Sequence, residues 1–306
     1  MKSFDLFKSF YSQVILSTYG RLIRVKRFIS VAIIIVLILL IPFTFVKLNS
    51  KEFCNGTTQA VGSKQIFLKS KYKVWEHLFK IQREEETLFL RFLNDSKNFK
   101  PRNKIIWYSP MRSYYPDKND MKYLSKFLSK VDIGGISDGK NIDGDGWGLP
   151  ENVEKYKVFY ELCINKTYDQ VALLARSRGA SSFISYVRQS SSPSFSVLAG
   201  IYPVIDWKSY PSFNILSSYT NKDENYLNLY NPGREANLQK FVNKIDKILL
   251  LHGTQDFTVP YSENSFILSR FPNVQIELIK GEGHNYSDKF YYNDSLIKLF
   301  EEYFFN

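Results

Sequence analysis

The amino-acid sequence predicts an α/β protein whose mostly parallel sheet has helices on both faces, preceded by one apolar membrane helix. Two observations carry this prediction. From Lys104 onward, short apolar runs alternate with helical stretches, and an uncharged run of nineteen residues stands near the N-terminus. Alternating strands and helices are typical of parallel sheets, because a crossover helix returns the chain to begin the next parallel strand.

The composition is that of a protein with a substantial core and a basic N-terminus. The 306 residues are 44% hydrophobic and 16% aromatic, which suits one large domain. The formal net charge is +11, and residues 1–27 hold six Lys or Arg against a single Asp. Such a cluster indicates an anionic membrane surface or a nucleic acid. Since no basic helix or stacked-aromatic motif is present, the membrane is favoured and no nucleic-acid partner is expected.

The apolar run extends from Phe28 to Val46. As a helix it would rise roughly 28 Å, which matches a hydrocarbon core of about 30 Å. A cleaved signal peptide is the rival interpretation, but residues 1–27 are long for that purpose and no small-residue cleavage site follows. Five Lys or Arg closely precede the run and three follow it, which predicts a cytoplasmic N-terminus. The bilayer is therefore an expected partner through residues 28–46, with the folded domain on the outer or periplasmic side.

Residues 47–65 are interpreted as a tether, because they are polar, contain Gly and Ser and show little periodicity. Residues 66–306 are then expected to form the folded domain. Its first part, Tyr72 to Ile81 and Thr87 to Leu93, alternates like two strands joined by a charged turn.

Six apolar runs are expected as buried strands and five stretches between or after them as helices. The expected strands are 104–109, 131–136, 170–175, 194–202, 247–253 and 274–280. The expected helices are 121–129, 151–162, 178–188, 262–271 and 288–305. In sheets of this kind the chemistry collects where the strands end.

The two cysteines, Cys54 and Cys163, are too few for a disulfide framework, and their spacing fits no zinc site. One bridge between them and two separate thiols are both consistent with the sequence, because a sequence contains no distance. Asp143 and Asp145 do not complete a calcium loop, since Trp147 takes the next ligand position. No metal and no other cofactor is indicated.

The segment QVALLARSRGASSFISYV predicts a strand, a sharp turn at Ser177 and a helix. A strand-to-helix turn of this kind exposes a nucleophilic hydroxyl, and small residues two positions before and after it let the turn pack. Gly179 fits the second position, and Ala175 replaces glycine at the first. The alternative is that Ser177 merely begins the helix, because serine is common near helix N-termini.

Two later loops supply partners for this serine. LLLHGTQDFTVP places Asp256 just beyond one expected strand, and KGEGHNY places His284 beyond the next. The chain order Ser, Asp, His is that of the α/β-hydrolases. His284 would take the Ser177 proton, Asp256 would fix the imidazole tautomer, and the serine would form an acyl intermediate. Of the other two histidines, His252 is interpreted as structural and His77 lies in an early expected strand.

From about Tyr72 to Asn306, the chain resembles the catalytic domain of the prolyl oligopeptidase family of serine peptidases. The resembling segments are GDGWG (144–148), AGIYPVIDW (199–207), HGTQDFTVP and GEGH, and related esterases share the last two. The resemblance implies an α/β-hydrolase fold for residues 66–306 and hydrolysis of a peptide or ester bond through an acyl-enzyme. The larger family members carry an N-terminal β-propeller, for which the roughly fifty residues between the apolar run and residue 104 leave no room.

The turn departs from the family pattern, which is Gly-Trp-Ser-Tyr-Gly-Gly. Arg176 and Arg178 flank Ser177, and Ala180 replaces the last glycine. Two cations beside a nucleophile favour an anionic substrate, unless the two side chains point outward. The outward orientation is the preferred expectation.

The oxyanion hole is expected to use the backbone N–H of Arg178 and one donor from the loop SPMRSYY that follows the strand at 104–109. The family typically has His-Gly-Gly in this loop. The proline that opens the loop here has no N–H. Met111 or Arg112 is therefore expected to supply the second donor, with a hydroxyl of Tyr114 or Tyr115 as the alternative.

The sequence thus predicts a membrane-anchored serine hydrolase of peptidase type. A carboxylesterase is the first alternative, because both classes use the same triad chemistry. A catalytically silent, membrane-anchored binding protein of the same fold is the second, motivated by Ala175, the two arginines and the proline of the oxyanion loop. A structure that holds Ser177 Oγ away from the His284 ring would favour the silent protein.

Overall fold

The computed structural model describes residues 53–66, 73–83, 87–109, 118–136, 147–191, 194–284 and 287–306. The chain divides into two compact units, Met1–Lys51 and Glu52–Asn306. The first unit, with the expected cytoplasmic segment (1–27) and membrane helix (28–46), lies outside the described residues. Within the described ranges, no helix is long and apolar enough to cross a membrane.

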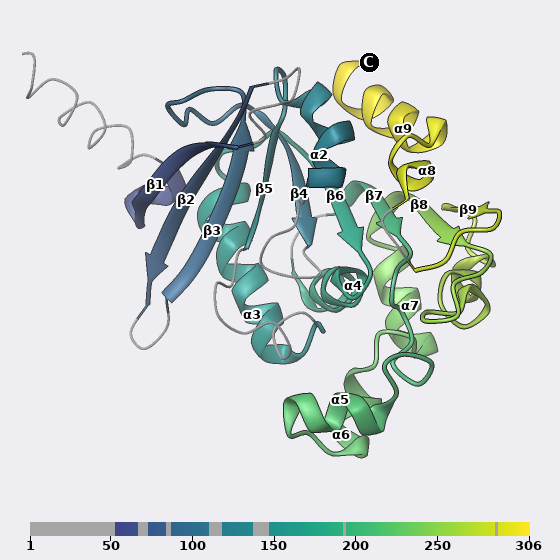
Figure 1. Ribbon diagram of the computed structural model, residues 1–306. Coiled ribbons are helices and arrows are strands. Elements are labelled where there is room, and N and C mark those ends of the chain that lie inside the picture. The colour runs from purple at the N-terminus through teal and green to yellow at the C-terminus, as the bar shows by residue number, and fades with distance from the viewer. Residues whose placement is uncertain are drawn as a thin grey trace, which may run out of the picture. The chain divides into compact units, whose positions relative to one another are not determined.

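A nine-stranded sheet forms the centre of the second unit (Figure 1). The strand order is β1-β2-β3-β5-β4-β6-β7-β8-β9; the first three pairings are antiparallel and the other five are parallel. The mostly parallel sheet is therefore confirmed. The strands are β1 (Thr58–Ile66), β2 (Val74–Gln82), β3 (Thr87–Asn94), β4 (Lys104–Ser109), β5 (Asp132–Ile136), β6 (Gln170–Arg176), β7 (Phe195–Ile201), β8 (Ile245–Gly253) and β9 (Val274–Ile279).

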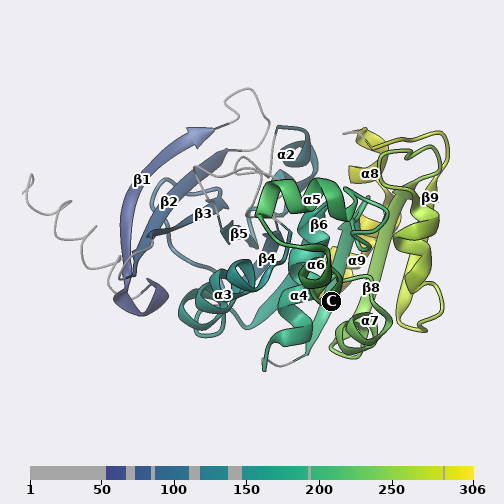
Figure 2. The ribbon, with the colours of Figure 1, turned by 90° about the horizontal axis from the view of Figure 1, so that it is seen from below.

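Helices cover both faces of this sheet, α3, α4 and α7 on one side and α2 and α9 on the other (Figures 1 and 2). Side chains along a strand point alternately to the two faces of the sheet, so adjacent residues of β4 contact different helical layers. Trp107 packs against Phe159 and Phe183 on the first side, whereas Ile106 shares the second cluster with Phe300. The helices and short helical turns are η1 (Phe53–Gly56), α2 (Lys118–Leu124), η2 (Ser125–Phe127), α3 (Pro150–Phe159), the π-helical turn η3 (Tyr160–Ile164), α4 (Gly179–Gln189), α5 (Phe213–Thr220), α6 (Glu224–Tyr230), α7 (Glu235–Val242), η4 (Tyr261–Glu263), η5 (Ser265–Leu268), α8 (Asp288–Tyr291) and α9 (Asp294–Phe305).

The expected helix at 262–271 is wrong. The segment forms only the short turns η4 and η5, which meet at Asn264, whose φ of −121° and ψ of −89° are not helical. The Asn264 side chain explains the break, because its Oδ1 accepts hydrogen bonds from the N–H groups of Ile205 (2.8 Å) and Asp206 (3.1 Å). The loop after β7 thus holds Asn264 in a conformation that no helix accommodates.

The expected single helix at 288–305 is two helices, α8 and α9. Asn293 separates them with an extended backbone, and its side chain accepts a 3.2 Å hydrogen bond from the Leu296 N–H. Asparagine is a favoured N-cap, because its side chain satisfies an N–H that has no partner within the helix. A local capping signal therefore interrupts the apolar periodicity.

The expected tether is wrong from residue 53 onward. Residues 53–65 form η1 and nearly all of β1, which pairs antiparallel with β2 at the edge of the sheet. Phe53 packs against Phe79 and Phe92, with ring centroids 5.1 and 5.0 Å apart. Seven successive residues of β1 are exposed, so this strand lacks the alternation by which a sequence shows a half-buried strand.

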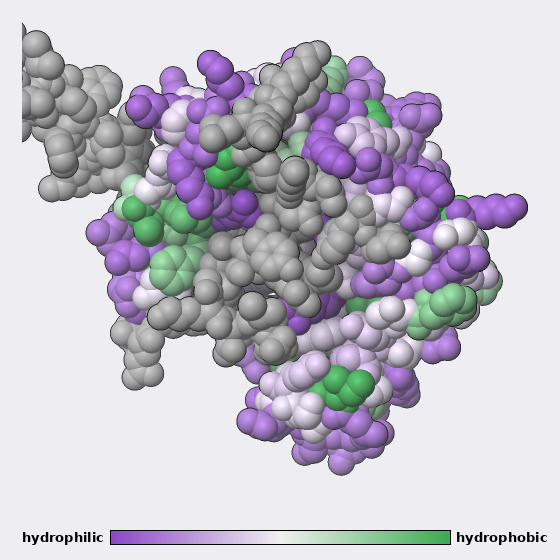
Figure 3. Space-filling view, in the orientation of Figure 1, coloured by the Kyte–Doolittle hydropathy of each residue, from purple (hydrophilic) through white to green (hydrophobic). Residues whose placement is uncertain are grey.

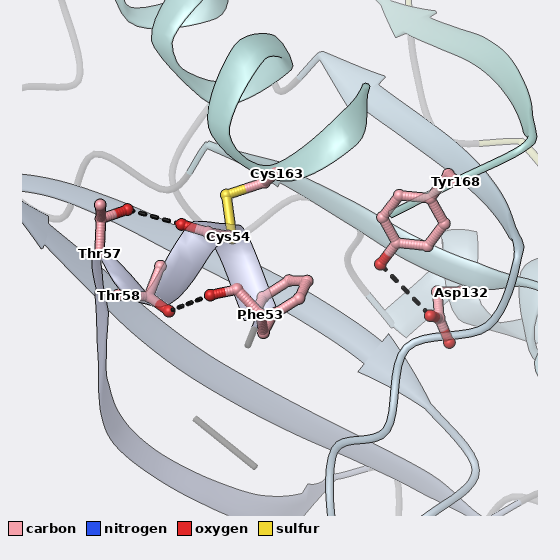
Figure 4. Close-up of a disulfide and its surroundings, with 7 residues drawn as sticks. All are labelled: Phe53, Cys54, Thr57, Thr58, Asp132, Cys163 and Tyr168. Carbon is pink, nitrogen blue, oxygen red and sulfur yellow. Dashed lines mark hydrogen bonds between the residues drawn. A yellow bond between two sulfur atoms is a disulfide. The ribbon is translucent and has the colours of Figure 1, made fainter. Parts of the chain in front are cut away.

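A disulfide bond joins Cys54 of η1 to Cys163 of η3, and Figure 4 shows it between the two turns. In the η1 turn, Thr57 Oγ1 donates to the Cys54 carbonyl at 2.7 Å and Thr58 Oγ1 donates to the Phe53 carbonyl at 3.2 Å. The bridge closes a chain segment with a sequence separation of 109. A cross-link of this kind restricts the unfolded chain, so it stabilises the fold and keeps β1 attached to the sheet.

Replacing both cysteines with serine should lower the free energy of unfolding by about 2–5 kcal/mol, because the unfolded chain regains the freedom that the bridge removes. Urea unfolding of the wild type and of the Cys54→Ser/Cys163→Ser variant measures the difference. As a control, a reducing agent should lower the wild-type midpoint and leave that of the variant unchanged. Equal midpoints for the oxidised wild type and the variant would contradict this role.

Between β7 and β8 the chain forms three helices that the sequence analysis does not predict, and two of them, α5 and α6, protrude from the helical layer (Figures 1 and 2). They pack on a separate apolar cluster that contains Trp147, Trp207 and Leu216. Ile215 and Leu229 remain exposed, and Figure 3 shows a small apolar area over this end of the domain. The two helices thus form a cap with its own small core.

Candidate active site

Ser177 lies at the sharp turn between β6 and α4, as the sequence predicts. Its φ is +50°, in the left-handed region that non-glycine residues rarely adopt. The Ser177 N–H donates to the Ile201 carbonyl at 3.0 Å, and the Ser177 carbonyl accepts from the N–H groups of Ala180 (3.0 Å) and Val204 (2.9 Å). Such a conformation costs about 1–3 kcal/mol and persists only where the surroundings impose it. The strand next to β6 therefore holds the turn in place.

The residues two positions before and after Ser177 are small for different steric reasons. A Cβ on Gly179 would lie 2.3 Å from the Ser109 carbonyl oxygen at the end of β4, so a side chain there would displace backbone. Ala175 is fully buried and pairs with Ser109 on one side and Gly200 on the other. The sheet thus accommodates a methyl group at the position where the family pattern has glycine.

Asp256 and His284 follow the neighbouring parallel strands β8 and β9, whose carboxyl ends lie at the same edge of the sheet as Ser177. His284 Nε2 is 3.0 Å from Ser177 Oγ, and His284 Nδ1 is 2.8 Å from Asp256 Oδ2. Because a carboxylate only accepts, Nδ1 carries the proton and Nε2 is left to accept from the serine hydroxyl. This is the geometry that an activated serine, its base and an orienting acid require.

The Asp256 carboxylate is buried and receives hydrogen bonds on both oxygens. Oδ1 accepts from the N–H groups of Thr258 (3.1 Å) and Val259 (2.8 Å), and Oδ2 faces His284 and, at 3.3 Å, His252 Nε2. Burial alone raises the pKa of Asp256, but hydrogen bonds from the two histidines and an amide outweigh burial and hold the pKa well below its usual range. Asp256 is therefore ionised at neutral pH.

His252, expected as structural, is buried next to this carboxylate. Its Nδ1 is 2.7 Å from Ser265 Oγ, and its Nε2 is 2.7 Å from the Val259 carbonyl and 3.3 Å from Asp256 Oδ2. The Val259 carbonyl can only accept, so Nε2 is the protonated nitrogen and also points at the carboxylate. This second histidine on Asp256 was not predicted, although His252 stands four residues before Asp256 in the segment HGTQD.

The arginine before the nucleophile does not point outward, and that expectation is wrong. Arg176 is 1% exposed; its Nη1 is 2.7 Å from Asp120 Oδ2, and its Nε donates to the Tyr202 hydroxyl at 2.5 Å. Arg178 is half-buried, and its guanidinium lies 5.5 Å from the centre of the Trp147 ring. Arg176 is therefore part of the protein interior and inaccessible to an anionic substrate.

Two aromatic rings lie next to His284. The Tyr202 ring lies 4.5 Å from the His284 ring and Tyr210 lies 6.4 Å from it, measured between centroids. Tyr210 also contacts Trp147, at 6.2 Å. Both tyrosines follow β7: Tyr202 belongs to the motif AGIYPVIDW (199–207), whereas Tyr210 lies just beyond it and was not predicted. They give His284 two aromatic neighbours.

The expected oxyanion donors are only partly within the described residues. Arg178 is the N-cap of α4, so its backbone N–H stands at the start of that helix. Met111 and Arg112 lie outside the described residues, as do the two tyrosines of the same loop. The oxyanion hole therefore stays a prediction.

Neither a protein-family model nor a curated protein matches the sequence. Solved structures do match. An acylaminoacyl peptidase from Pyrococcus horikoshii superimposes with a TM-score of 0.56 at 16% identity, over 78% of this chain and 43% of that one. A puromycin-hydrolyzing peptidase from Mycobacterium tuberculosis gives 0.53 at 12% identity, over 82% and 46%.

The fold is that of the α/β-hydrolases. An S-formylglutathione hydrolase from Agrobacterium tumefaciens has the same fold, with a TM-score of 0.56, 11% identity and coverage of 80% of this chain and 99% of that one. The present chain spans less than half the length of the peptidases that it matches. The resemblance to prolyl oligopeptidase-type catalytic domains is thus confirmed as a likeness of fold.

Gly179→Ala should lower the free energy of unfolding by about 1–3 kcal/mol, because the new methyl group meets the buried backbone of β4. Urea unfolding measures the loss. Gly62→Ala is the matched control, since a Cβ at Gly62 meets nothing within 4 Å. A Gly179→Ala variant as stable as the control would contradict the steric account of the turn.

The depressed pKa of Asp256 predicts a specific pH dependence of stability. A carboxylate with a lowered folded-state pKa stabilises the fold above the unfolded value of about 3.9, and this contribution is lost as the pH falls toward the folded-state pKa. The contribution of this carboxylate to the stability difference between the wild type and Asp256→Asn should therefore be complete above about pH 5 and shrink below about pH 4. Urea titrations across this range measure it, and a constant difference would contradict the lowered pKa.

Proposed function

We propose that the protein is a membrane-anchored serine hydrolase that cleaves an amide or ester bond through an acyl-enzyme. The observation that supports this most strongly is the 3.0 Å separation of Ser177 Oγ and His284 Nε2. The 2.8 Å contact of His284 Nδ1 with an ionised, buried Asp256 supports it further. Ser177 is the proposed nucleophile, His284 the proposed base and Asp256 the proposed orienting acid.

In this mechanism Ser177 Oγ attacks the substrate carbonyl carbon while His284 Nε2 takes the hydroxyl proton. The Asp256 carboxylate stabilises the imidazolium that forms. His284 then gives the proton to the leaving amine or alcohol, and an attacking water, deprotonated by the same nitrogen, releases the acyl group. The developing oxyanion would be bound by the Arg178 N–H at the positive end of α4, with Met111 or Arg112 as the second donor.

A catalytically silent binding protein is disfavoured by the same geometry. Ala175 fits between its neighbouring strands, and Arg176 is neutralised inside the protein by Asp120. Two of the departures that motivated a silent protein therefore leave the serine and the histidine within hydrogen-bonding distance.

Peptide bonds are the first proposed substrates and acyl esters the second. The neighbours named as peptidases support the first. The match to nearly the whole of an S-formylglutathione hydrolase supports the second, since that protein has the same fold without additional length. The half-buried Tyr210 ring beside the histidine suits an apolar group next to the bond that is cleaved.

The proposal includes the anchor at residues 28–46, with a cytoplasmic N-terminus and the catalytic domain on the other side of the membrane. The Cys54–Cys163 disulfide supports this placement of the domain. Structural disulfides form and persist in oxidising compartments and are rare in the cytosol.

The decisive experiment is labelling of the full-length protein, purified in detergent, with a fluorophosphonate probe. Labelling should occur in the wild type and be lost in Ser177→Ala and His284→Ala, and Ser177→Ala should lower hydrolysis by up to about a millionfold. The exposed Ser218→Ala on α5 is the control and should label normally. Turnover retained in Ser177→Ala would sink the assignment of the nucleophile, and no labelling of a folded wild type would favour the silent protein. Matched anilide and ester substrates with one acyl group then separate peptidase from esterase.

A further inference from the structure

A buried polar network lies directly behind the nucleophile, and the mechanism above does not use it. Arg176, the residue before Ser177, ends β6 with its side chain inside the protein. Its guanidinium forms an ion pair with Asp120 of α2 and donates a second hydrogen bond to the Tyr202 hydroxyl. Three elements, β6, α2 and the end of β7, thus meet at one arginine.

Stability alone does not account for a buried ion pair at this place. Removing two charges from water costs several kcal/mol for each ion, and apolar side chains of similar volume often serve the fold equally well or better. The family pattern has tryptophan where this chain has Arg176. The network is therefore best explained by what it holds in position.

Tyr202 is the part of the network that reaches the active site. Its ring packs edge-to-face on the His284 ring, with centroids 4.5 Å apart and planes at 62°. On its other side Tyr202 packs against Phe290 at 5.2 Å. Burial raises the pKa of Tyr202 to about 12, so the hydroxyl that Arg176 holds is a neutral phenol. Tyr202 therefore connects the buried guanidinium to the proposed base.

Tyr202, like Ser177, has its backbone in the strained left-handed region. Its φ is +36°, and its N–H donates to the Leu251 carbonyl at 2.7 Å. Left-handed non-glycine residues cost free energy and gather at functional sites, where the surroundings impose them. Ser177 and Tyr202 are two such residues at the ends of adjacent strands, and the Ser177 N–H bonds to Ile201, the residue before Tyr202.

His284 needs such support because it lies in a loop. Its hydrogen bond to Asp256 fixes one ring nitrogen but leaves the tilt of the ring about that bond undetermined. Proton transfer from Ser177 depends on the position of Nε2, and an error of about 1 Å costs on the order of a hundredfold in rate. The Tyr202 ring, packed edge-to-face with the imidazole, supplies a further contact that defines the plane of the imidazole.

We propose that Tyr202 is a positioning residue for the His284 imidazole and that the buried Arg176–Asp120 pair holds Tyr202 in place. The proposal rests on the hydrolase function proposed above. It gives the arginine beside the nucleophile a role that needs no contact with the substrate, in agreement with its 1% exposure.

Two variants of Tyr202 test the contact with the histidine. Tyr202→Leu removes the ring edge and should lower kcat by about ten- to a hundredfold with KM nearly unchanged, because the base is misplaced after the substrate has bound. Tyr202→Phe keeps the ring but loses the hydroxyl contacts with Arg176 and Tyr291, so its kcat should lie between those of the wild type and Tyr202→Leu. Rates are normalised by fluorophosphonate titration, which counts folded, reactive sites.

Replacing both members of the Arg176–Asp120 ion pair tests whether the pair holds Tyr202 in place. Arg176→Met/Asp120→Leu removes both charges together, so neither is left buried alone. The matched control is Arg91→Met/Glu76→Leu, which removes another buried pair, on β3 and β2. We expect only the first double variant to lower kcat.

The outcomes separate this proposal from the hydrolase function. If the wild type labels and turns over, while Tyr202→Leu and the Arg176/Asp120 variant keep wild-type kcat per titrated site, the positioning role is overturned and the hydrolase stands. If the wild type neither labels nor turns over, the hydrolase function itself fails. A lower kcat in both ion-pair variants, the Arg91/Glu76 control included, would show a general loss of stability and would also overturn the proposal.

Discussion

The left-handed backbone of Ser177 is the constraint on which the site depends. The conformation is unfavourable by itself, and hydrogen bonds to the residues at the end of β7 and just beyond it hold it in place. Those bonds exist only if β6 and β7 pair in the observed parallel register, in which Arg176 lies opposite Ile201. Gly179 also lies very close to the end of β4, so the turn depends on the position of that strand as well. The pairing of the central strands therefore determines the conformation of the Ser177 turn.

Around this turn, the charged groups are arranged so that each has an opposite charge or a set of donors. Asp256 is ionised because two histidines and two backbone amides face it. Arg176 is kept inside by Asp120 and Tyr202. A buried charge without such partners would cost several kcal/mol, so each of these charged groups depends on its partners to remain buried. The polar interior at this edge of the sheet forms a connected support for the proposed catalytic side chains.

Two parts of the domain lie outside its central sheet core and have supports of their own. The edge strand β1 is attached through the Cys54–Cys163 bridge, and the cap of α5 and α6 has its own apolar cluster with Trp147 and Trp207. Neither alters the central strand pairings. The fold is shared with peptidases and with an S-formylglutathione hydrolase, so the fold by itself does not distinguish between the two proposed classes of substrate.

By itself, the sequence determined the six strands from residue 104 onward, although β9 is not buried as expected, together with the order of Ser177, Asp256 and His284 and their meeting at one edge of the sheet. Apolar runs identify strands locally, and parallel topology brings their carboxyl ends together. Only the tertiary structure decided that residues 58–66 join the sheet, that Asn264 breaks a helix, that Cys54 bridges to Cys163 and that Arg176 turns inward. Each of these depends on partners far along the chain, such as Ile205 for Asn264 and Asp120 for Arg176. Local patterns carry no record of such distant contacts, because they form only when the chain has folded.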